Sequence, residues 1–167
     1  NEKYHKKCLS TINYIIEKIS KKTYPLSFGY GISGIAWTIK HLNRKKIIDI
    51  DNEIFIDIEN YLYDSLHNHF STCNFDLTSG FIGESLFFIN YDRSNRSNKI
   101  IKCIIDNFKN YALPLGNGIG WKDFEYRELN KNYFNFGLAH GQASIIAYLS
   151  NLIIKKKISN RQIDSVK

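Results

Sequence analysis

The chain has 167 residues, of which 43% are hydrophobic and 23% charged, and its formal net charge is +7. This composition excludes a disordered chain, and the length suffices for one domain with its own core. No segment has the roughly 20 apolar residues of a membrane-spanning helix, and an amphipathic segment follows the basic residues 1–7 where a signal peptide would be apolar.

The positive charges are spread along the chain. Lysines stand singly or in pairs between apolar residues, which is typical of a solvated surface, and no motif of the common nucleic-acid-binding modules occurs. We therefore expect no nucleic-acid partner. The three cysteines, Cys8, Cys73 and Cys103, are too widely spaced for a disulfide framework, which favours a reducing, cytoplasmic location.

Three amphipathic segments predict helices. Apolar residues recur at steps of three and four in residues 8–19, 55–66 and 100–108. Between residues 114 and 136 lies a glycine-rich stretch that predicts a long loop or a cavity rim, with a two-stranded excursion around Trp121 to Tyr126.

A pair of small residues three apart follows each amphipathic segment, at 31–34, 80–83 and 141–144, and is followed by a more apolar stretch. The pairs are GxxG in the first two copies, and Ser144 replaces the second glycine in the third. Such in-phase repeats predict helix pairs in which glycine starts the apolar, inner helix.

The repeats predict an all-α fold, in which residues 1–167 form a single domain and about half of an α/α toroid. An open solenoid is the alternative. Helix N-termini carry unpaired N–H groups and partial positive charge, so their convergence at one end of a ring predicts a polar cavity that favours anions.

Two residues near the glycines are candidates for catalysis. His140 directly precedes Gly141, and an imidazole there could act as general acid or base, or simply hydrogen-bond the loop. Asp76 lies four residues before Gly80 and could orient a histidine, anchor a substrate amine, or serve as an ordinary helix N-cap or turn residue.

Candidate substrate-binding residues come from the same positions and from the long loop. Tyr30 and Ser79 precede their glycines as His140 precedes Gly141, and Trp121 follows the glycines of the loop. A further cluster, His67, His69 and Cys73, has metal-binding residue types, but the two histidines point to different faces of a helix. No metal site is therefore predicted.

The segment 134–141, FNFGLAHG, closely resembles the N-x-GLAHG motif of lanthionine synthetase C-like proteins. The upstream segment 76–83, Asp-x-x-x-Gly-x-x-Gly, and the first GxxG are also similar to that family. The resemblance spans roughly Tyr24 to Leu152, and the chain looks like the N-terminal half of such a protein.

The resemblance implies a function. Family members hold a catalytic zinc at the centre of the toroid and add peptide cysteine thiols to dehydroalanine or dehydrobutyrine, forming the thioether rings of lantibiotic-type peptides. It implies a precursor peptide as substrate, a lantibiotic dehydratase as a possible partner, an acid–base role for His140, and a place for Asp76 in the same pocket.

One departure concerns the zinc. The family's WCYG and CHG motifs, which supply zinc ligands, do not occur here. We therefore expect zinc in the complete protein but ligands outside this chain, which is either truncated or a degenerate member, truncation being simpler. This fragment alone is expected to be inactive.

Two other functions remain open. One is a non-catalytic helical-repeat module that binds peptides. The other is an α/α-toroid enzyme acting on carbohydrate, which needs two acidic residues across the cavity, here Asp76 with Glu84 or Asp123.

Overall fold

The computed structural model of the chain describes residues 2–21, 23–50, 52–69, 74–91, 95–126, 133–159 and 161. These residues form six helices and one two-stranded hairpin. In chain order they are α1 (Glu2–Ile19), α2 (Ile32–Arg44), α3 (Asn52–His69), α4 (Phe81–Tyr91), α5 (Asn95–Asn110), β1 (Leu113–Leu115), β2 (Gly118–Gly120) and α6 (Gln142–Ile154).

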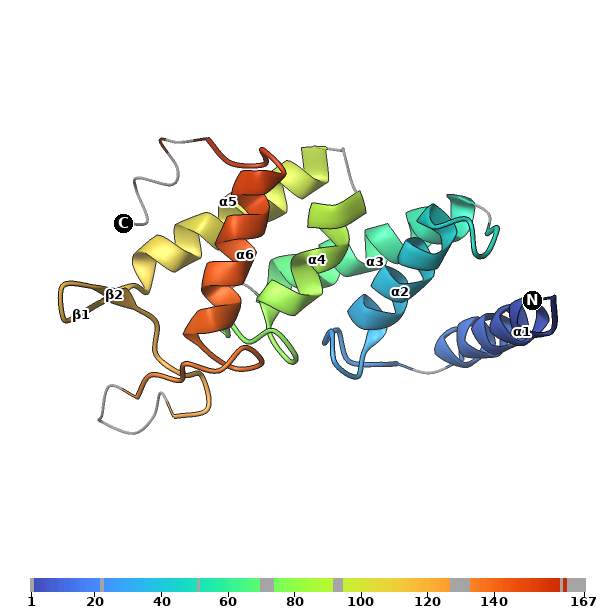
Figure 1. The fold of residues 1–167 in the computed structure, drawn as a ribbon, viewed down its shortest axis with the longest axis horizontal. Coiled ribbons are helices and arrows are strands. Elements are labelled where there is room, and N and C mark those ends of the chain that lie inside the picture. The colour runs from blue at the N-terminus through green and yellow to red at the C-terminus, as the bar shows by residue number, and fades with distance from the viewer. Residues whose placement is uncertain are drawn as a thin grey trace.

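Helices α2 to α6 form two rows, and α1 lies to one side of them (Figure 1). Helices α2, α4 and α6 lie side by side with the loops that precede them at one common edge, and α4 packs against both of its neighbours. Helices α3 and α5 form the second row and also contact α4. The row of α2, α4 and α6 is the predicted inner row. Each of its helices begins directly after a repeat glycine: α2 after Gly31, α4 after Gly80 and α6 after Gly141. The predicted all-α architecture with glycine at the inner-helix starts is therefore confirmed.

The two rows differ in the way their residues are buried. Helix α5 buries one face, with Ile100, Ile101, Ile104, Ile105 and Phe108 each at most 2% exposed. Helix α4 lies between four other helices and is apolar nearly all round, and its two consecutive residues Phe87 and Phe88 are both buried. Complete burial of such a side chain contributes about 1.5–3 kcal/mol, so α4 anchors the core that supports the loops.

The hairpin lies earlier in the chain than predicted. Strand β1 pairs antiparallel with β2, and Gly116 adopts a left-handed φ of 59° in the turn between them. The prediction of strands around Trp121 to Tyr126 was wrong because Trp121 returns to the core directly after β2. Its indole N–H donates to the Phe108 carbonyl oxygen at 2.7 Å.

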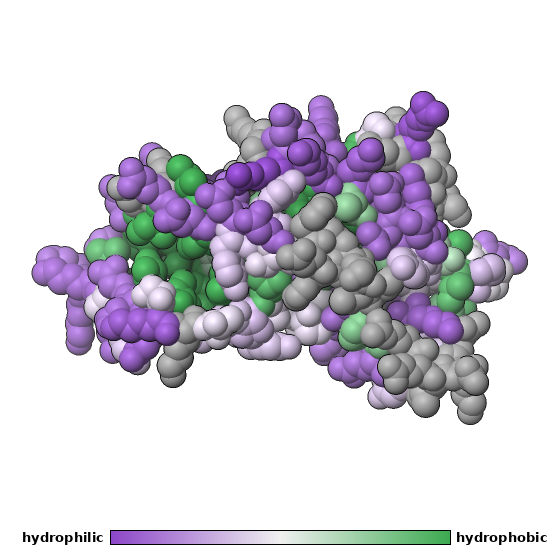
Figure 2. All heavy atoms as spheres, turned by 180° about the vertical axis from the view of Figure 1, so that it is seen from behind, coloured by the Kyte–Doolittle hydropathy of each residue, from purple (hydrophilic) through white to green (hydrophobic). Residues whose placement is uncertain are grey.

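A hydrophobic hollow lies at the α1 end of the molecule, as Figure 2 shows from behind. It has a volume of about 700 Å³, and its wall includes isoleucines of α1, α2 and α3 as well as Lys21 and Asp57. Within the part of the chain that the structure describes, no helix is both long and apolar enough to cross a membrane.

Candidate functional site

The three loops that precede the inner helices share one backbone hydrogen bond. The N–H of the residue after each glycine donates to the carbonyl oxygen of a residue seven positions earlier. These bonds are Ile32 to Pro25 at 2.9 Å, Phe81 to Asn74 at 3.0 Å and Gln142 to Asn135 at 2.7 Å. Each loop thus folds back over the start of its helix and satisfies an N–H group that would otherwise be unpaired.

The glycines permit this close approach. A Cβ atom added to Gly141 would lie 2.0 Å from the Asn135 carbonyl oxygen, and one added to Gly80 would lie 2.4 Å from that of Asn74. Both distances are far below van der Waals contact with backbone atoms that cannot move independently. Any side chain at these positions would push the loop away from the helix.

Backbone hydrogen bonds also join each loop to the next. The Gly29 N–H donates to the Thr78 carbonyl oxygen at 2.8 Å, and the Leu77 N–H donates to the Ala139 carbonyl oxygen at 3.1 Å. The second bond places Asp76 and His140, which are 64 residues apart in the chain, on adjacent loops.

Asp76 is held in one orientation by its own loop. Its Oδ1 accepts hydrogen bonds from the Thr78 N–H at 2.6 Å, the Thr78 hydroxyl at 2.7 Å and the Ser79 N–H at 2.7 Å. Its Oδ2 pairs with Nδ1 of His140. Asp76 is therefore both the turn residue and the histidine partner that the sequence left as alternatives.

The pair shifts the ionisation of both groups. Burial alone would raise the pKa of Asp76, but the hydrogen bonds from Thr78 and Ser79 and the contact with His140 outweigh it, so its pKa lies below the usual value. The hydrogen bond to Asp76 raises the pKa of His140, with smaller contributions from the charges of Glu125 and Asp123. Both shifts favour an imidazolium–carboxylate pair near neutral pH.

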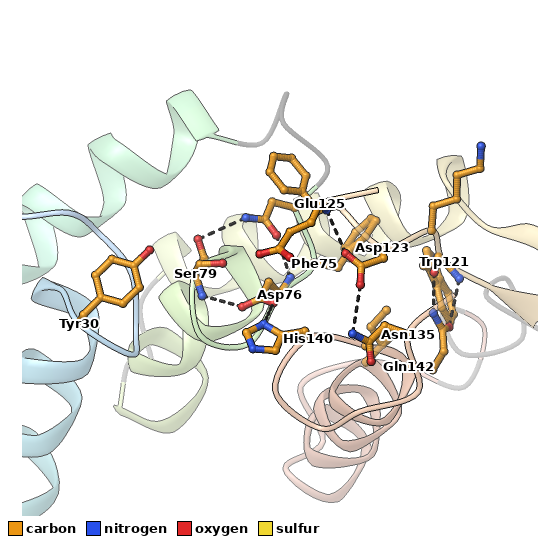
Figure 3. A pocket seen from close by; sticks show the side chains of 15 residues that line it. Tyr30, Phe75, Asp76, Ser79, Trp121, Asp123, Glu125, Asn135, His140 and Gln142 are labelled. Carbon is orange, nitrogen blue, oxygen red and sulfur yellow. Dashed lines mark hydrogen bonds and ion pairs between the residues drawn. The ribbon is translucent and has the colours of Figure 1, made fainter. Parts of the chain in front are cut away.

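His140 and Asp76 lie in a cavity of about 310 Å³ (Figure 3). Tyr30 stands at one side of the pair and Trp121 at the other, and Ser79 lies beside Asp76. Tyr30 is 68% exposed, whereas Trp121 is 5% exposed and is fixed by the core. The structure thus brings all five predicted site residues to one cavity, and their roles stay predictions.

The described residues that line the cavity include more carboxylates than basic groups. Among them, Asp76, Asp123 and Glu125 contribute carboxylates, against Lys122 and His140. The helix starts were expected to create an anion-friendly cavity; the described loop residues place three carboxylates around those starts, and the anion preference stays a prediction. Glu84 does not line the cavity; it is buried in α4, and burial raises its pKa to about 7.

The described residues provide no metal centre. No group of three or more His, Cys, Asp or Glu side chains among them could hold a metal ion. Cys8 on α1 and Cys103 on α5 are free thiols, and neither lines the cavity. The weak candidate cluster of His67, His69 and Cys73 lies outside the described side chains.

Three polar residues around the site were given no role from the sequence. Thr78 fixes Asp76, while Asn135 and Gln142 hold the loop that carries His140. One signal could have revealed Asn135, because Asn74 and Asn135 both stand six residues before their glycines. Nothing in the local sequence indicates the partner of Gln142, which is 21 residues away.

Comparison with known proteins decides the family. The model of the family described as lanthionine synthetase C-like protein matches residues 1–167. The chain belongs to the lanthionine synthetase C-like family. Among solved structures it is similar to a nisin cyclase, with a TM-score of 0.74 and 20% sequence identity. No curated protein matches the sequence.

The match to the nisin cyclase covers 99% of this chain but 44% of that chain, so the chain spans less than half the length of this relative. The likeness establishes the fold as part of an α/α toroid, as predicted. The predicted family and its N-terminal part are also confirmed.

Proposed function

We propose that the complete polypeptide containing this chain closes thioether rings in a peptide, by adding a cysteine thiol to dehydroalanine or dehydrobutyrine. The observation that carries the proposal is the His140–Asp76 pair, which lies in the cavity beside the glycine-containing loops. The chain that holds this pair belongs to the lanthionine synthetase C-like family. The similarity to a nisin cyclase supports a peptide as the proposed substrate. The dehydrated residue requires an earlier dehydration, for which we propose a dehydratase partner.

His140 is placed for proton transfer. Its Nδ1 is held by Asp76, which leaves Nε2 without a hydrogen-bond partner among the described residues. The side chain is 52% exposed, so a substrate can reach it. Because its pKa is raised, the ring is protonated in a larger share of molecules near neutral pH and can donate a proton there.

The reaction needs no oxidant or reductant. The sulfur forms a bond to the β-carbon of the dehydro residue while the C=C π pair moves towards the carbonyl, giving an enolate. We propose that the thiol releases its proton to solvent before attack, that the imidazolium of His140 donates the proton that the α-carbon takes up, and that the neutral ring then regains a proton from solvent. Asp76 stabilises the charged ring until it donates its proton.

Zinc is expected from the family resemblance alone. The family resemblance implies a zinc that lowers the thiol pKa, but the described residues of this chain do not form a site for it. We propose that its ligands come from residues outside this chain.

The test is ring closure by the complete natural polypeptide that includes these residues. A peptide with one cysteine and one dehydroalanine is incubated with it, and the remaining free thiol is measured by alkylation and mass spectrometry, because cyclisation itself leaves the mass unchanged. We expect the alkylated form to disappear with wild-type protein. Peptide binding without loss of alkylation would contradict a cyclase and favour the peptide-binding module.

A further inference from the structure

Two clamps hold the loop that carries His140. At its far end, Gln142 exchanges two hydrogen bonds with the backbone of Trp121: the Trp121 N–H donates to Gln142 Oε1 at 3.1 Å, and Gln142 Nε2 donates to the Trp121 carbonyl oxygen. At its near end, Asn135 Nδ2 donates to Asp123 Oδ2 at 3.1 Å. The loop is therefore tied at both ends to residues 121–123 (Figure 3).

Asp123 is an unusual residue for this position. Asp123 is only 6% exposed. Burial of a carboxylate is unfavourable unless hydrogen bonds replace those lost from water. Its Oδ1 accepts the Glu125 N–H at 2.9 Å, and its Oδ2 accepts from Asn135. The buried carboxylate thus joins two segments of chain.

Asn135 passes this constraint to the loop. Its Oδ1 accepts the Gly137 N–H at 2.8 Å, and its carbonyl oxygen accepts the Gln142 N–H at 2.7 Å. The side chain of Asn135 therefore links Asp123 on one side with the loop backbone three residues before His140 on the other.

We propose that Asp123 is a positioning residue, which acts through Asn135 to hold His140 against Asp76 in its reactive orientation. This inference rests on the proposed acid–base role of His140. Asp123 itself does not contact the reacting atoms; its hydrogen bonds fix the loop from which the imidazole projects.

The donor and acceptor pattern allows the two side chains to be exchanged. In the double variant Asp123→Asn with Asn135→Asp, the amide oxygen at 123 can accept the Glu125 N–H and its NH2 group can donate to the carboxylate at 135. The second carboxylate oxygen at 135 can accept the Gly137 N–H. All three side-chain hydrogen bonds are restored, and the negative charge of the pair is kept.

Each single variant breaks the pattern in a different way. Asp123→Asn leaves one amide donor facing another donor, so we expect kcat for ring closure to fall about 10-fold with little change in KM. Asn135→Asp sets two carboxylates against each other, so we expect a fall of about 100-fold. The double variant should return to within about 3-fold of wild type, and Asp106→Asn on α5, exposed and outside the cavity, is the matched control.

A second readout does not need activity. The pKa of His140, followed by the NMR titration of its C2 proton in the complete polypeptide, reports the charges of Asp76, Asp123, Glu125 and Lys122 that line the cavity with it. We expect it to fall in Asp123→Asn and to be largely restored in the double variant. If wild type closes no rings, the proposed function fails, while this titration still tests the positioning.

Additive effects would overturn the inference. If the double variant is as slow as the product of the two single losses, and the His140 titration is not restored, Asp123 and Asn135 do not act as a pair. If Asn135→Asp does not fold, recovery of folding on adding Asp123→Asn supports the pairing, and failure of the double variant to fold where Asp123→Asn alone folds contradicts it.

Discussion

The loops at residues 74–80 and 135–141 have the same backbone hydrogen bonds but supply different chemical groups to the cavity. In both, an asparagine six residues before the glycine accepts an N–H two residues later with its Oδ1 and accepts the N–H after the glycine with its carbonyl oxygen. The first places Asp76 four residues before its glycine, where the second has Gly137. The second places His140 one residue before its glycine, where the first has Ser79.

The comparison shows how a repeat protein can build a site. Two loops with the same backbone hydrogen bonds border one cavity, and a different position in each loop then supplies the acid and the imidazole. The asparagine amides also differ: Asn74 Nδ2 donates within its own loop, to Ser79, whereas Asn135 Nδ2 reaches Asp123. The asparagine amide thus ties the histidine loop to a residue outside it, whereas in the aspartate loop the amide bonds within the loop.

The largest effect is expected where the two loops are most alike. Gly141→Ala and Gly80→Ala should each lower the free energy of unfolding by roughly 2–4 kcal/mol, because the new Cβ meets a backbone carbonyl. Denaturant unfolding measures the change. Gly118→Ala is the control, since its Cβ would lie 3.8 Å from the nearest atom. Equal losses at all three positions would mean that the shared loop backbone is not a constraint.

Activity should separate the loops by their chemistry. His140→Gln should slow ring closure by about 100-fold or more, because the amide cannot transfer a proton. The rate of loss of alkylatable thiol measures it, and peptide binding should persist. His5→Gln on the exposed side of α1 serves as control. A change of less than about 3-fold in His140→Gln would remove the acid–base assignment.

A smaller effect is expected within the aspartate loop. Thr78→Val removes the hydroxyl that donates to Asp76 and should lower the free energy of unfolding by about 1 kcal/mol. Thr78→Ser keeps the donor and should recover most of the loss. Chemical denaturation of both variants at pH 7 provides the comparison, and identical stabilities of Val and Ser would show that the hydroxyl does not support Asp76.

The smallest effect concerns pH. The raised pKa of His140 means that its ion-pair contribution is complete below its ordinary pKa of about 6.5 and is lost as pH rises through the folded value. The lowered pKa of Asp76 means that the contribution is present above about pH 3.9 and is lost as pH falls through the folded value.

The difference in unfolding free energy between wild type and His140→Gln should therefore be greatest between about pH 4 and 6.5. It should stay below about 1 kcal/mol, because the histidine is half exposed. Denaturation curves across pH 3 to 9, about the range spanned by the two groups, would show it. A difference that grows as pH rises past neutrality would have the wrong sign for this pair.

Much of the architecture could be predicted from the sequence because its signals are local. Apolar spacing indicates the amphipathic helices, and in-phase glycines mark the starts of α2, α4 and α6. His140 was found from its place directly before Gly141, Asp76 from its place four residues before Gly80, and both from the family motifs. Their direct contact was not predictable from either loop alone, because it depends on the hydrogen bond between Leu77 and Ala139.

The remaining features depend on contacts between distant segments. The hairpin was misplaced by a few residues because the position of Trp121 is set by its hydrogen bond to Phe108, not by strand propensity. The grouping of carboxylates in the lining was not predicted because Asp123 and Glu125 reach the cavity through the long loop, whose path no periodicity reveals.

The most direct test of the central claim is the pKa of His140 in the complete polypeptide, measured by NMR in wild type and in Asp76→Asn. If the two loops form one acid–base pair, the wild-type value lies above about 6.5 and the substitution lowers it. An unchanged value in Asp76→Asn would show that the two residues are neighbours without acting together.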